Sequence, residues 1–482
     1  MVDIGVAGVS GVLLFGFSRV REGSVTRLRV PTLPAARLCS MPKLLILSPF
    51  LALTSATNNG FPNSLGVTPL RGSRTWNSVR QLINQSFLVS QVDGLFAALG
   101  GGGSLFSSGF TDVGIDDAWE ACGAGVNGSY HDPKGRPLIN TTRFPDMGGL
   151  TAYARGKNAT MSWYGNCCGC QRGEHNLSSP HYAEDAAAVV QFGFSGIKID
   201  GCGNEPNMTA WATALNATGV PLMLENCNDG SPFRPTRAPD GTVDCPYNHF
   251  RTSIDGAPNF RSTMWNVQET LPWLSVSSPG CFGYADMLTI GSPAPPLMDD
   301  PAFVANCGGK RLSEAEARAQ MAAFSLLSSP LVLGFDVANA SERALWGPIV
   351  THAPTLAANA AWDGEAGRLV ARAPRNTTVP LAVGGICELM QHYTIADWLV
   401  VGKRLASSAA GATTRFAAVA LVGDWAAPAD LSAPLDAMGF PSGAVVDSVD
   451  GWTGADTGPV TGAWRLAGVP APGGQYRVFT LR

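Results

Sequence analysis

Charged and hydroxylated side chains recur where short apolar segments end in the middle of the chain. The residues concerned are Asp116, Asp117, Tyr164, Asn166, Lys198, Asp200, Glu225, Asn226, Arg251, Asp255 and Asp286. Burying a charged side chain at the mouth of a fold is energetically costly unless an opposite charge or a ligand pairs with it. Carboxylate, lysine or arginine side chains at the same end of successive segments therefore predict a polar pocket for a polyhydroxylated ligand.

One spacing in this set suits a nucleophile. Asp200 follows Lys198 by two residues, so both side chains point to the same side of an extended strand. A neighbouring ammonium group favours the ionised form of a carboxyl group. We therefore expect Asp200 to be an anion, as a nucleophilic carboxylate must be.

The elements that must position these residues alternate along the chain. We expect strands over 112–116, 160–165, 194–200, 221–226, 249–254, 285–290 and 331–336, and helices over 147–156, 183–192, 208–216 and 314–327. Ser313 and Glu316 suit a capping box at the start of the last helix. Repeated strand-then-helix over about 250 residues predicts an α/β fold, a (β/α)8 TIM barrel, with an open doubly wound sheet as the competing architecture.

The residue pattern changes in the last part of the chain. Short runs rich in valine and phenylalanine, at 398–401, 415–422, 443–449 and 476–481, are separated by Gly, Pro, Asp and Ser. This pattern predicts an antiparallel β-sandwich. We therefore expect a leader region over 1–56, a catalytic barrel over 57–366 and a C-terminal β-sandwich domain over 367–482.

The leader region has the features of a secretory signal peptide. Lys43 precedes an apolar run over 44–54 that ends in small residues, and Met41 is a candidate start. Nine Asn-x-Ser/Thr sequons support the same interpretation: Asn84, Asn127, Asn140, Asn158, Asn176, Asn207, Asn216, Asn339 and Asn376. We expect a glycoprotein that is secreted or delivered to the lysosome or vacuole.

Composition excludes several classes of protein. The 482 residues carry a formal charge of −4 and are 45% hydrophobic and 15% charged. This composition excludes an intrinsically disordered chain and argues against a nucleic-acid-binding protein. No apolar run reaches the roughly 18 residues that span a bilayer, so we expect no membrane span. The oligomeric state stays open, with a homodimer as one candidate.

Eleven cysteines are present, of which Cys39 lies in the leader region. The remaining even number predicts disulfides in an oxidising compartment. A cluster of zinc-ligand types lacks the paired CxxC frame of a zinc site, so we expect no metal. The cluster comprises Cys167, Cys168, Cys170, His175 and Cys202.

Eight short motifs follow one another along the chain: 66–77 (GVTPLRGSRTWN), 114–119 (GIDDAW), 143–145 (RFP), 197–202 (IKIDGC), 214–219 (ALNATG), 250–255 (FRTSID), 286–291 (DMLTIG) and 328–331 (SSPL). In this order they resemble the motifs of the retaining α-galactosidases of glycoside hydrolase family 27, the melibiase-like enzymes. Each motif alone is weak, but the ordered set is specific. The resemblance covers the chain from about residue 64 to 367.

The resemblance implies hydrolysis of terminal α-galactosyl units of an oligosaccharide or glycoconjugate through a covalent glycosyl-enzyme. Asp200 would be the nucleophile and Asp255 the general acid and then base, and the two carboxyl groups suffice without a cofactor. Burial away from cations would keep Asp255 protonated. The implied substrate-binding residues are Asp116, Asp117 and Lys198 at the far hydroxyls, Arg251 beside the 2-hydroxyl, Trp76 and Tyr164 along the sugar face, and Asp286. The implied disulfides are Cys202 with Cys168 or Cys170, and Cys227 with Cys245.

Three departures from the family pattern concern the pocket and its wall. The family has a Cys-Glu-Trp sequence whose Glu contacts the 2-hydroxyl, and Asn228 follows Cys227 at that point here. The segment 280–288 (GCFGYADML) replaces the family's GGWNDPDML, and 359–362 (NAAW) replaces its NQD. These changes leave galactose, N-acetylgalactosamine and a pentopyranose as candidate glycones.

Other functions stay open on this evidence. A related α-N-acetylgalactosaminidase or β-L-arabinopyranosidase would use the same two carboxyl groups. A transglycosylase would capture the same intermediate with a sugar hydroxyl. A catalytically retired carbohydrate-binding barrel would bind sugar without turnover, and an Asp200→Ala variant would separate it from an enzyme.

Overall fold

The computed structural model describes residues 63–167, 181–203, 207–227, 234–292, 311–383, 386–406 and 413–482. The chain divides into a short first unit, Met1–Leu53, and a second unit, Thr54–Arg482. All described residues belong to the second unit. The expected leader region lies outside them.

Eight parallel strands form the predicted barrel, with neighbours in the order β10-β1-β2-β3-β4-β5-β8-β9. A parallel bridge between Leu288, just after β9, and Leu333 of β10 joins the two ends of this order. The strands are β1 (Arg71–Arg74), β2 (Asp112–Gly114), β3 (Thr160–Cys167), β4 (Gly196–Gly203), β5 (Met223–Cys227), β8 (His249–Arg251), β9 (Phe282–Tyr284) and β10 (Leu331–Leu333). A small antiparallel hairpin, β6 (Thr236–Arg237) and β7 (Val243–Asp244), precedes β8.

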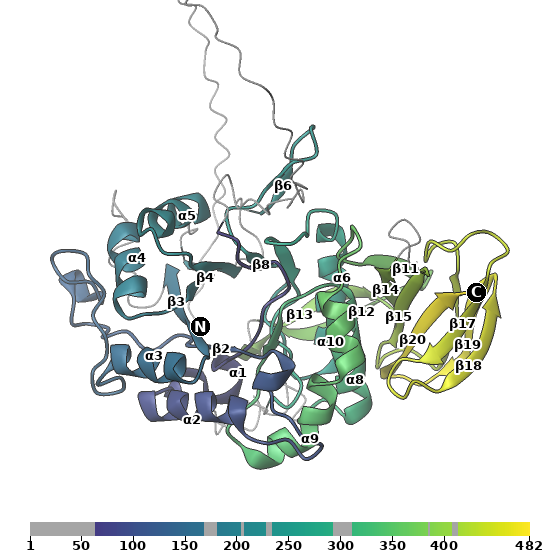
Figure 1. Ribbon diagram of the computed structural model, residues 1–482, viewed down its shortest axis with the longest axis horizontal. Coiled ribbons are helices and arrows are strands. Elements are labelled where there is room, and N and C mark those ends of the chain that lie inside the picture. Colours follow the sequence, from purple (N-terminus) through teal and green to yellow (C-terminus); the bar gives the residue numbers. More distant parts are fainter. Residues whose placement is uncertain are drawn as a thin grey trace, which may run out of the picture. The chain divides into compact units, whose positions relative to one another are not determined.

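Helices follow the strands, and several of them cover the outside of β2, β3 and β4 (Figure 1). They are α1 (Trp76–Val79), α2 (Gln85–Phe96), α3 (Met147–Gly156), α4 (Tyr182–Gln191), α5 (Met208–Ala217), α6 (Phe260–Thr270), α8 (Glu314–Leu326), α9 (Ala340–Val350) and α10 (Ala353–Ala360). A side-chain oxygen caps the first turn of six of them: Asn84, Asp146, Asn207, Asn259, Ser313 and Asn339. The expected capping box of Ser313 and Glu316 is confirmed. No helix in the described ranges has the length and apolarity needed to cross a membrane.

One expected strand differs in the structure. The segment 285–290 holds only the isolated bridge at Leu288, and the regular strand β9 ends at Tyr284. The cause is the backbone of Asp286, whose φ of 100° is incompatible with an extended strand. The chain turns at the mouth of the barrel instead of continuing along it.

The C-terminal part is antiparallel, as expected. A six-stranded sheet has the order β11-β14-β15-β20-β17-β18, and two-stranded ribbons β12-β13 and β16-β19 accompany it. The strands are β11 (Arg368–Arg372), β12 (Asn376–Val383), β13 (Ile386–Ala396), β14 (Trp398–Ala406), β15 (Arg415–Val422), β16 (Ala429–Pro434), β17 (Val445–Asp450), β18 (Asp456–Thr461), β19 (Ala463–Val469) and β20 (Gly473–Leu481).

The two faces of this sheet are both buried, which explains its near-continuous apolar strands. Alternate residues of β15 such as Val419 and Leu421 belong to the barrel core, where α8 packs against the sheet. The residues between them, such as Phe416 and Ala418, form a second core with Leu431 and Trp464 of the β16-β19 ribbon. The β domain is therefore a two-layer structure, and one face of its larger sheet packs against α8 on the outside of the barrel.

A fully buried lysine joins the β domain to the barrel. Lys403 of β14 is 0% exposed, and its ammonium group donates to Ser328 Oγ at 2.6 Å. It also donates to the carbonyl oxygens of Ala358 and Asn359, at 3.0 and 3.2 Å. Burial lowers the pKa of Lys403 to about 7.

Candidate active site

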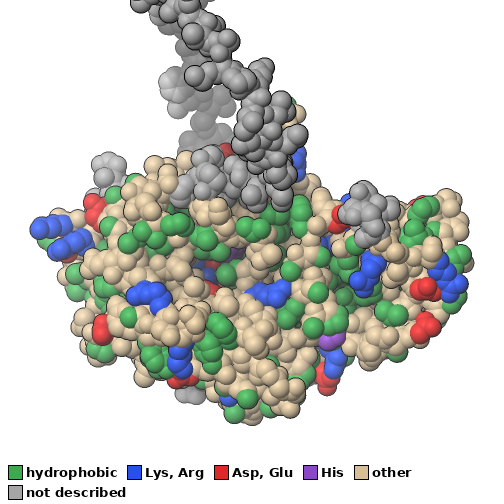
Figure 2. Space-filling view, in the orientation of Figure 1, with side chains coloured by type: hydrophobic (Ala, Val, Ile, Leu, Met, Phe, Trp, Pro, Cys, Tyr) green, Lys and Arg blue, Asp and Glu red, His purple; other side chains and the backbone are tan. Residues whose placement is uncertain are grey.

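The predicted site residues meet at one mouth of the barrel because their strands are in register. Tyr164 of β3 is opposite Lys198 of β4, and Asp200 of β4 is opposite Cys227 of β5. Side chains two residues apart on a strand share a face, so Lys198 and Asp200 both point inward. Acidic, basic and histidine atoms come to the surface near the middle of the barrel face (Figure 2).

Asp200 is held by two hydrogen bonds. The Tyr164 hydroxyl donates to Oδ2 at 2.7 Å, and the backbone N–H of Gly201 donates to Oδ1 at 2.9 Å. The Asn166 side-chain amide in turn donates to the Tyr164 hydroxyl at 3.2 Å. Both carboxylate oxygens therefore have a fixed orientation, and the side chain is still partly exposed.

Lys198 forms an ion pair with Asp116, which follows the carboxyl end of β2. The Nζ–Oδ2 distance is 2.8 Å, and the two side chains are 7% and 3% exposed. Burial acts to lower the pKa of Lys198, but the nearby carboxylates, Asp116 first among them, raise it well above its ordinary value. Asp200 contributes in the same direction. Lys198 is therefore a cation shared between the expected nucleophile and an expected sugar-binding carboxylate.

Asp117, next to Asp116, lies at the edge of the site and is half-buried. Its backbone N–H donates to Asp116 Oδ1 at 3.0 Å, and its own Oδ1 accepts from the N–H of Ala118 at 2.7 Å. Ala118 has a φ of 83°, so the chain turns sharply immediately after the two carboxylates. This turn brings both of them to the end of β2.

Asp255 forms an ion pair with Arg251, four residues earlier. The expectation that Asp255 is buried away from cations is wrong. Burial acts to raise the pKa of Asp255, but Arg251 and Lys198 lower it below its ordinary value. In the absence of a ligand, Asp255 is therefore a carboxylate that is held beside a guanidinium group.

Asp286 is a buried carboxyl group at this mouth whose pKa is raised, as is the pKa of Asp116, because burial disfavours the charged form. It is 2% exposed, and it accepts a hydrogen bond from the backbone N–H of Gly256. Burial raises its pKa to about 7, with Arg251 opposing the shift and Asp255 adding to it. Its φ of 100° is strained for a residue other than glycine.

Trp76 is the first residue of α1, two residues after β1, where the sequence predicted a wall of the sugar pocket. Its ring packs against the buried side chains of Tyr284, Met287 and Val332. The guanidinium group of Arg80 lies over the ring, 5.2 Å from the centroid. Arg80 interacts electrostatically with Asp255 and Asp116. Sequence reasoning missed Arg80, because its φ of 50° turns the chain back toward the mouth in a way that no spacing reveals.

A buried ionic layer supports the site from below. Arg74 of β1 forms salt bridges with Asp112 of β2 at 2.8 Å and with Glu225 of β5 at 2.9 Å. Each of these side chains is at most 3% exposed. His249 of β8 lies 3.1 Å from the same Glu225 carboxylate. Gly114 makes room for this layer, since a Cβ there would lie 1.8 Å from Arg74 Nη1. Glu225 is therefore part of this buried ionic layer and does not line the open pocket.

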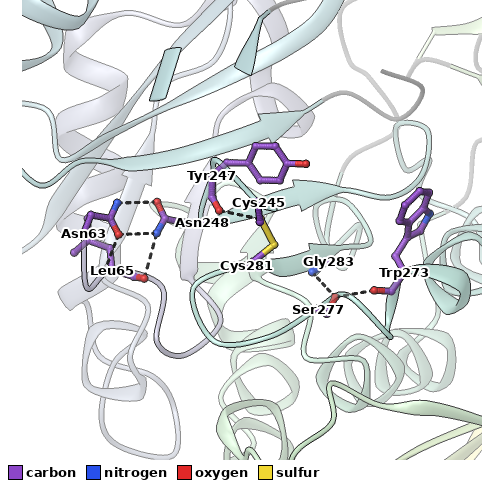
Figure 3. The surroundings of a disulfide bond; sticks show 9 residues. All are labelled: Asn63, Leu65, Cys245, Tyr247, Asn248, Trp273, Ser277, Cys281 and Gly283. Carbon is purple, nitrogen blue, oxygen red and sulfur yellow. Dashed lines mark hydrogen bonds between the residues drawn. A yellow bond between two sulfur atoms is a disulfide. The ribbon is translucent and has the colours of Figure 1, made fainter. Parts of the chain in front are cut away.

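The cysteine pairing differs from the family-based expectation. Cys245 is bonded to Cys281, with a Cα–Cα distance of 6.3 Å, so the expected Cys227–Cys245 disulfide is wrong (Figure 3). Cys227 is a buried free cysteine. It lies opposite Asp200 and points into the barrel, whereas Cys281 directly precedes Phe282, which pairs with His249 of β8, four residues after Cys245. Cys122 is also disulfide-bonded.

Several expectations fall on parts of the chain that are not described. Asn228, Cys168, Cys170 and His175 lie outside the described residues, as do the side chains of Cys167 and Cys202. The expected disulfide of Cys202 with Cys168 or Cys170 therefore stays a prediction. The expectation that the cysteine cluster holds no metal is likewise untested. Within the described ranges, no group of three His, Cys, Asp or Glu side chains is placed to hold a metal ion.

Relatives of this chain are α-galactosidases. A probable α-galactosidase of Dictyostelium discoideum is 26% identical over 322 residues, which cover 65% of this chain and 74% of that one. The crystal structure of α-galactosidase I from Mortierella vinacea matches with a TM-score of 0.63 at 19% identity, over 88% of this chain and 98% of that one. The α-galactosidase of Saccharomyces cerevisiae solved with raffinose matches with a TM-score of 0.64 at 16% identity, over 87% and 99%.

The model of the melibiase family that is described as alpha galactosidase A matches residues 97–347, which is more than half of the chain. This range contains the expected nucleophile, the expected acid/base and the Lys198–Asp116 pair. The motifs, the eight-stranded barrel and this match agree, and the chain belongs to the melibiase family of α-galactosidases, glycoside hydrolase family 27.

Proposed function

We propose that this protein is a retaining exo-α-galactosidase that hydrolyses terminal α-D-galactosyl residues through a covalent glycosyl-enzyme. The observation that carries the proposal is the placement of Asp200 and Asp255 at one mouth of a family 27 barrel. Asp200 is oriented by Tyr164 and Gly201, and Asp255 is paired with Arg251.

In the first step, an oxygen of Asp200 attacks C1 of the galactosyl unit while Asp255 donates a proton to the leaving oxygen. The C1–O bond to the aglycone breaks, and an ester between C1 and Asp200 forms. Asp200 is suited to attack because two fixed hydrogen bonds orient both of its oxygens. Asp255 must gain a proton first, since Arg251 favours its ionised form in the absence of a ligand.

In the second step, Asp255 accepts a proton from water, and the water oxygen attacks C1. The ester bond breaks, and Asp200 is released as a carboxylate. Two displacements at C1 restore the original α configuration. The cationic pair of Lys198 and Arg251 near Asp200 stabilises the returning negative charge.

The remaining polar groups account for recognition of the sugar. Asp116, Asp117 and Lys198 would bind the hydroxyl groups far from C1, and Arg251 would lie beside the 2-hydroxyl. These charged side chains are held by one another in the absence of a ligand, as in the 2.8 Å pair of Lys198 and Asp116. A sugar hydroxyl that both donates and accepts can bridge such a pair without leaving either charge unpaired.

Azide rescue of two variants tests the roles of the two carboxyl groups. With p-nitrophenyl α-galactoside, Asp200→Ala should be inactive, and added azide should attack the substrate directly to give β-galactosyl azide. Asp255→Ala should still form the ester with this good leaving group, and azide should then displace Asp200 to give α-galactosyl azide. On a natural disaccharide, loss of the general acid should cost about 10²–10⁴-fold in kcat/KM.

The control is Asp244→Asn, which removes an exposed carboxylate on β7 and should leave activity unchanged. The products are distinguished by the anomeric proton coupling in their NMR spectra. The same anomer from both variants would contradict the assignment of the two roles. Unchanged hydrolysis by Asp200→Ala would contradict the nucleophile itself.

We also propose that the protein is a secreted or lysosomal/vacuolar glycoprotein. Eight of the nine sequon asparagines lie in described residues, and all eight are exposed or half-buried. The disulfide between Cys245 and Cys281 suits an oxidising compartment. Enzymatic removal of N-glycans should lower the mass of the expressed protein, and N-terminal sequencing should find a start after about Ala56. An unchanged mass and an intact Met1 would contradict this proposal.

A further inference from the structure

One buried carboxyl group at the edge of the site has no role in the proposed mechanism. Glu120 is 5% exposed and lies three residues after Asp117. The segment between them is anchored to the barrel, because the indole N–H of Trp119 donates to the carbonyl oxygen of Tyr164 at 3.0 Å. The backbone of Glu120 also pairs with Ile139 in an isolated antiparallel bridge. The fold therefore fixes Glu120 in a buried position, where its carboxyl group requires a hydrogen-bonding partner.

The carboxyl groups of Glu120 and Asp117 meet at one backbone donor. The N–H of Ala118 donates to Asp117 Oδ1 at 2.7 Å and to Glu120 Oε2 at 2.9 Å. The backbone of Ala118, with a φ of 83°, turns the chain so that both side chains reach this N–H. The two carboxyl groups also share a side-chain hydrogen bond. An ionised carboxyl group only accepts hydrogen bonds, so a bond between two carboxyl groups requires a proton on one of them.

Burial indicates which of the two groups carries this proton. Glu120 is almost fully buried, whereas Asp117 is half-buried at the mouth of the barrel. Burial raises the pKa of Glu120 well above its ordinary value, and Asp117 adds to the shift, while the backbone N–H groups of Glu120 and Ala118 oppose it. Glu120 is therefore the neutral acid of the pair, and Asp117 is the carboxylate.

The other charged and titratable groups around this turn have partners of their own. Lys198 of β4 is paired with Asp116 at 2.8 Å. The guanidinium group of Arg143 donates to backbone carbonyl oxygens. The hydroxyl of Tyr164 on β3 donates to the expected nucleophile. Glu120 therefore keeps its carboxyl partner, and no cation among the described residues forms an ion pair with it.

We propose that Glu120 is a positioning residue of the sugar pocket: as a neutral carboxylic acid it donates a hydrogen bond to Asp117 and fixes the Asp117 carboxylate toward the sugar hydroxyls far from C1. The inference rests on the proposed function, which places Asp117 at these hydroxyls. A carboxylate has about four acceptor positions, so the bonds from Ala118 and Glu120 leave capacity for the sugar. Glu120 itself does not touch the substrate and acts through Asp117.

The physical benefit is orientation without loss of charge. A carboxylate that is already held in place gives up little side-chain freedom when it binds a sugar hydroxyl. A cation in the position of Glu120 would compete with the sugar for the charge of Asp117, whereas a neutral acid leaves that charge in place. An ionised Glu120 would instead repel Asp117, because like charges at this distance are unfavourable.

Infrared spectroscopy tests the protonation of Glu120. The difference spectrum between the wild type and Glu120→Gln at neutral pH should contain the C=O stretching band of a neutral carboxylic acid. The matched control is Glu314→Gln on α8, where an exposed glutamate paired with Arg318 is replaced, and its difference spectrum should contain only the bands of an ionised carboxylate. Carboxylate bands in the Glu120→Gln spectrum overturn the inference.

Kinetics with p-nitrophenyl α-galactoside test the action through Asp117. Glu120→Gln keeps an N–H donor at this position, so its KM should stay within about threefold of the wild type. Glu120→Met removes the donor and should raise KM at least tenfold while kcat changes less than threefold, because the far hydroxyls are bound alike in the ground state and the transition state. An equal rise of KM in both variants, an unchanged KM in Glu120→Met, or a loss confined to kcat overturns the inference.

Deoxy sugars test which part of the ligand Glu120 affects. Binding of galactose, 4-deoxygalactose and 6-deoxygalactose to the wild type and to Glu120→Met is measured by calorimetry. The tenfold weakening caused by Glu120→Met should shrink to a few-fold for the sugar that lacks the hydroxyl bound by Asp117. The same weakening for all three sugars overturns the inference.

The two proposals fail in different ways. If the wild type hydrolyses the α-galactoside but Glu120 is an ionised carboxylate, the proposed function stands and the inference falls. If the neutral acid band is present and galactose binding depends on Glu120 as described, but no glycoside is hydrolysed, the inference stands and the hydrolase assignment falls. If galactose neither binds nor is released from any glycoside, both fall.

Discussion

Replacing Asp286 by asparagine should make the stability of the protein less dependent on pH. Asp286 is 2% exposed, and burial raises its pKa from 3.8 to about 7. A carboxyl group with a raised pKa holds its proton more tightly in the folded state than in the unfolded state. Its contribution is therefore present below the unfolded pKa, and it is lost as the pH rises from about 4 toward 7.

The size of the effect follows from the shift. About three pKa units at 1.4 kcal/mol each give an upper estimate of about 4 kcal/mol between pH 4 and pH 7. At pH 4 the neutral Asp286 resembles asparagine, so Asp286→Asn should have a free energy of unfolding similar to that of the wild type. At pH 7 the variant should be more stable, because it no longer buries a carboxylate beside Asp255.

Urea unfolding at half-unit steps from pH 4 to pH 8 measures this difference directly. Asp244→Asn, an exposed substitution on β7, serves as the control and should give a difference that does not change with pH. A flat difference for Asp286→Asn would mean that Asp286 titrates at an ordinary pH. A difference of the opposite sign would mean that its carboxylate stabilises the fold through Arg251, and either result would refute the reasoning.

Three further experiments test the buried charges. Lys198→Met should lower the free energy of unfolding by about 3–5 kcal/mol because it leaves Asp116 buried and unpaired, and adding Asp116→Asn should recover part of the loss in urea unfolding. Gly114→Ala should cost about 3 kcal/mol in the same assay, because its methyl group would displace the Arg74 guanidinium. Lys403 has a pKa lowered to about 7, so wild-type stability should rise by at most about 1.4 kcal/mol per unit from pH 7 to 10, and Lys403→Met should remove that slope.

Local sequence signals predicted the scaffold well. The helix over 147–156 has the expected bounds, because Asp146 caps its first turn and small and apolar residues follow. The strand over 415–422 also has the expected bounds, since an apolar run between turn residues suits a strand that is buried on both faces. The missed ribbon strands, such as β16 and β19, are short and half-exposed, and they depend on pairing with each other.

The sequence predicted which residues form the site, but it did not predict which of these residues pair with one another. The spacing of Lys198 and Asp200 correctly placed both side chains on one face of a strand. The direct partner of Lys198 is nevertheless Asp116, which reaches it from β2 across the intervening strand β3. Pairings of this kind depend on strand tilt and register around the closed barrel, which the residue spacing within one segment does not contain.

The same limit explains the two corrections that concern the site. Cys227 was matched to Cys245 by family resemblance, but the register turns its side chain into the barrel, so Cys281 takes its place. The pKa of Asp255 depends on where the Arg251 side chain ends, four residues away along an irregular segment after β8. Both properties arise from side-chain direction, which becomes fixed only when the barrel closes.

The ionic contacts explain how this barrel keeps a fixed site although its wall departs from the family pattern. The Lys198–Asp116 pair ties β4 to the end of β2, and Arg74 ties β1 to β2 and β5. The Lys198–Asp116 and Arg74–Glu225 contacts join strands that are not neighbours, so they hold these strand ends from inside the barrel. Buried ion pairs add little net stability compared with apolar packing, because desolvation offsets their attraction. Their benefit here is orientation: functional groups on strands that are tied from inside keep their geometry while the surrounding segments change.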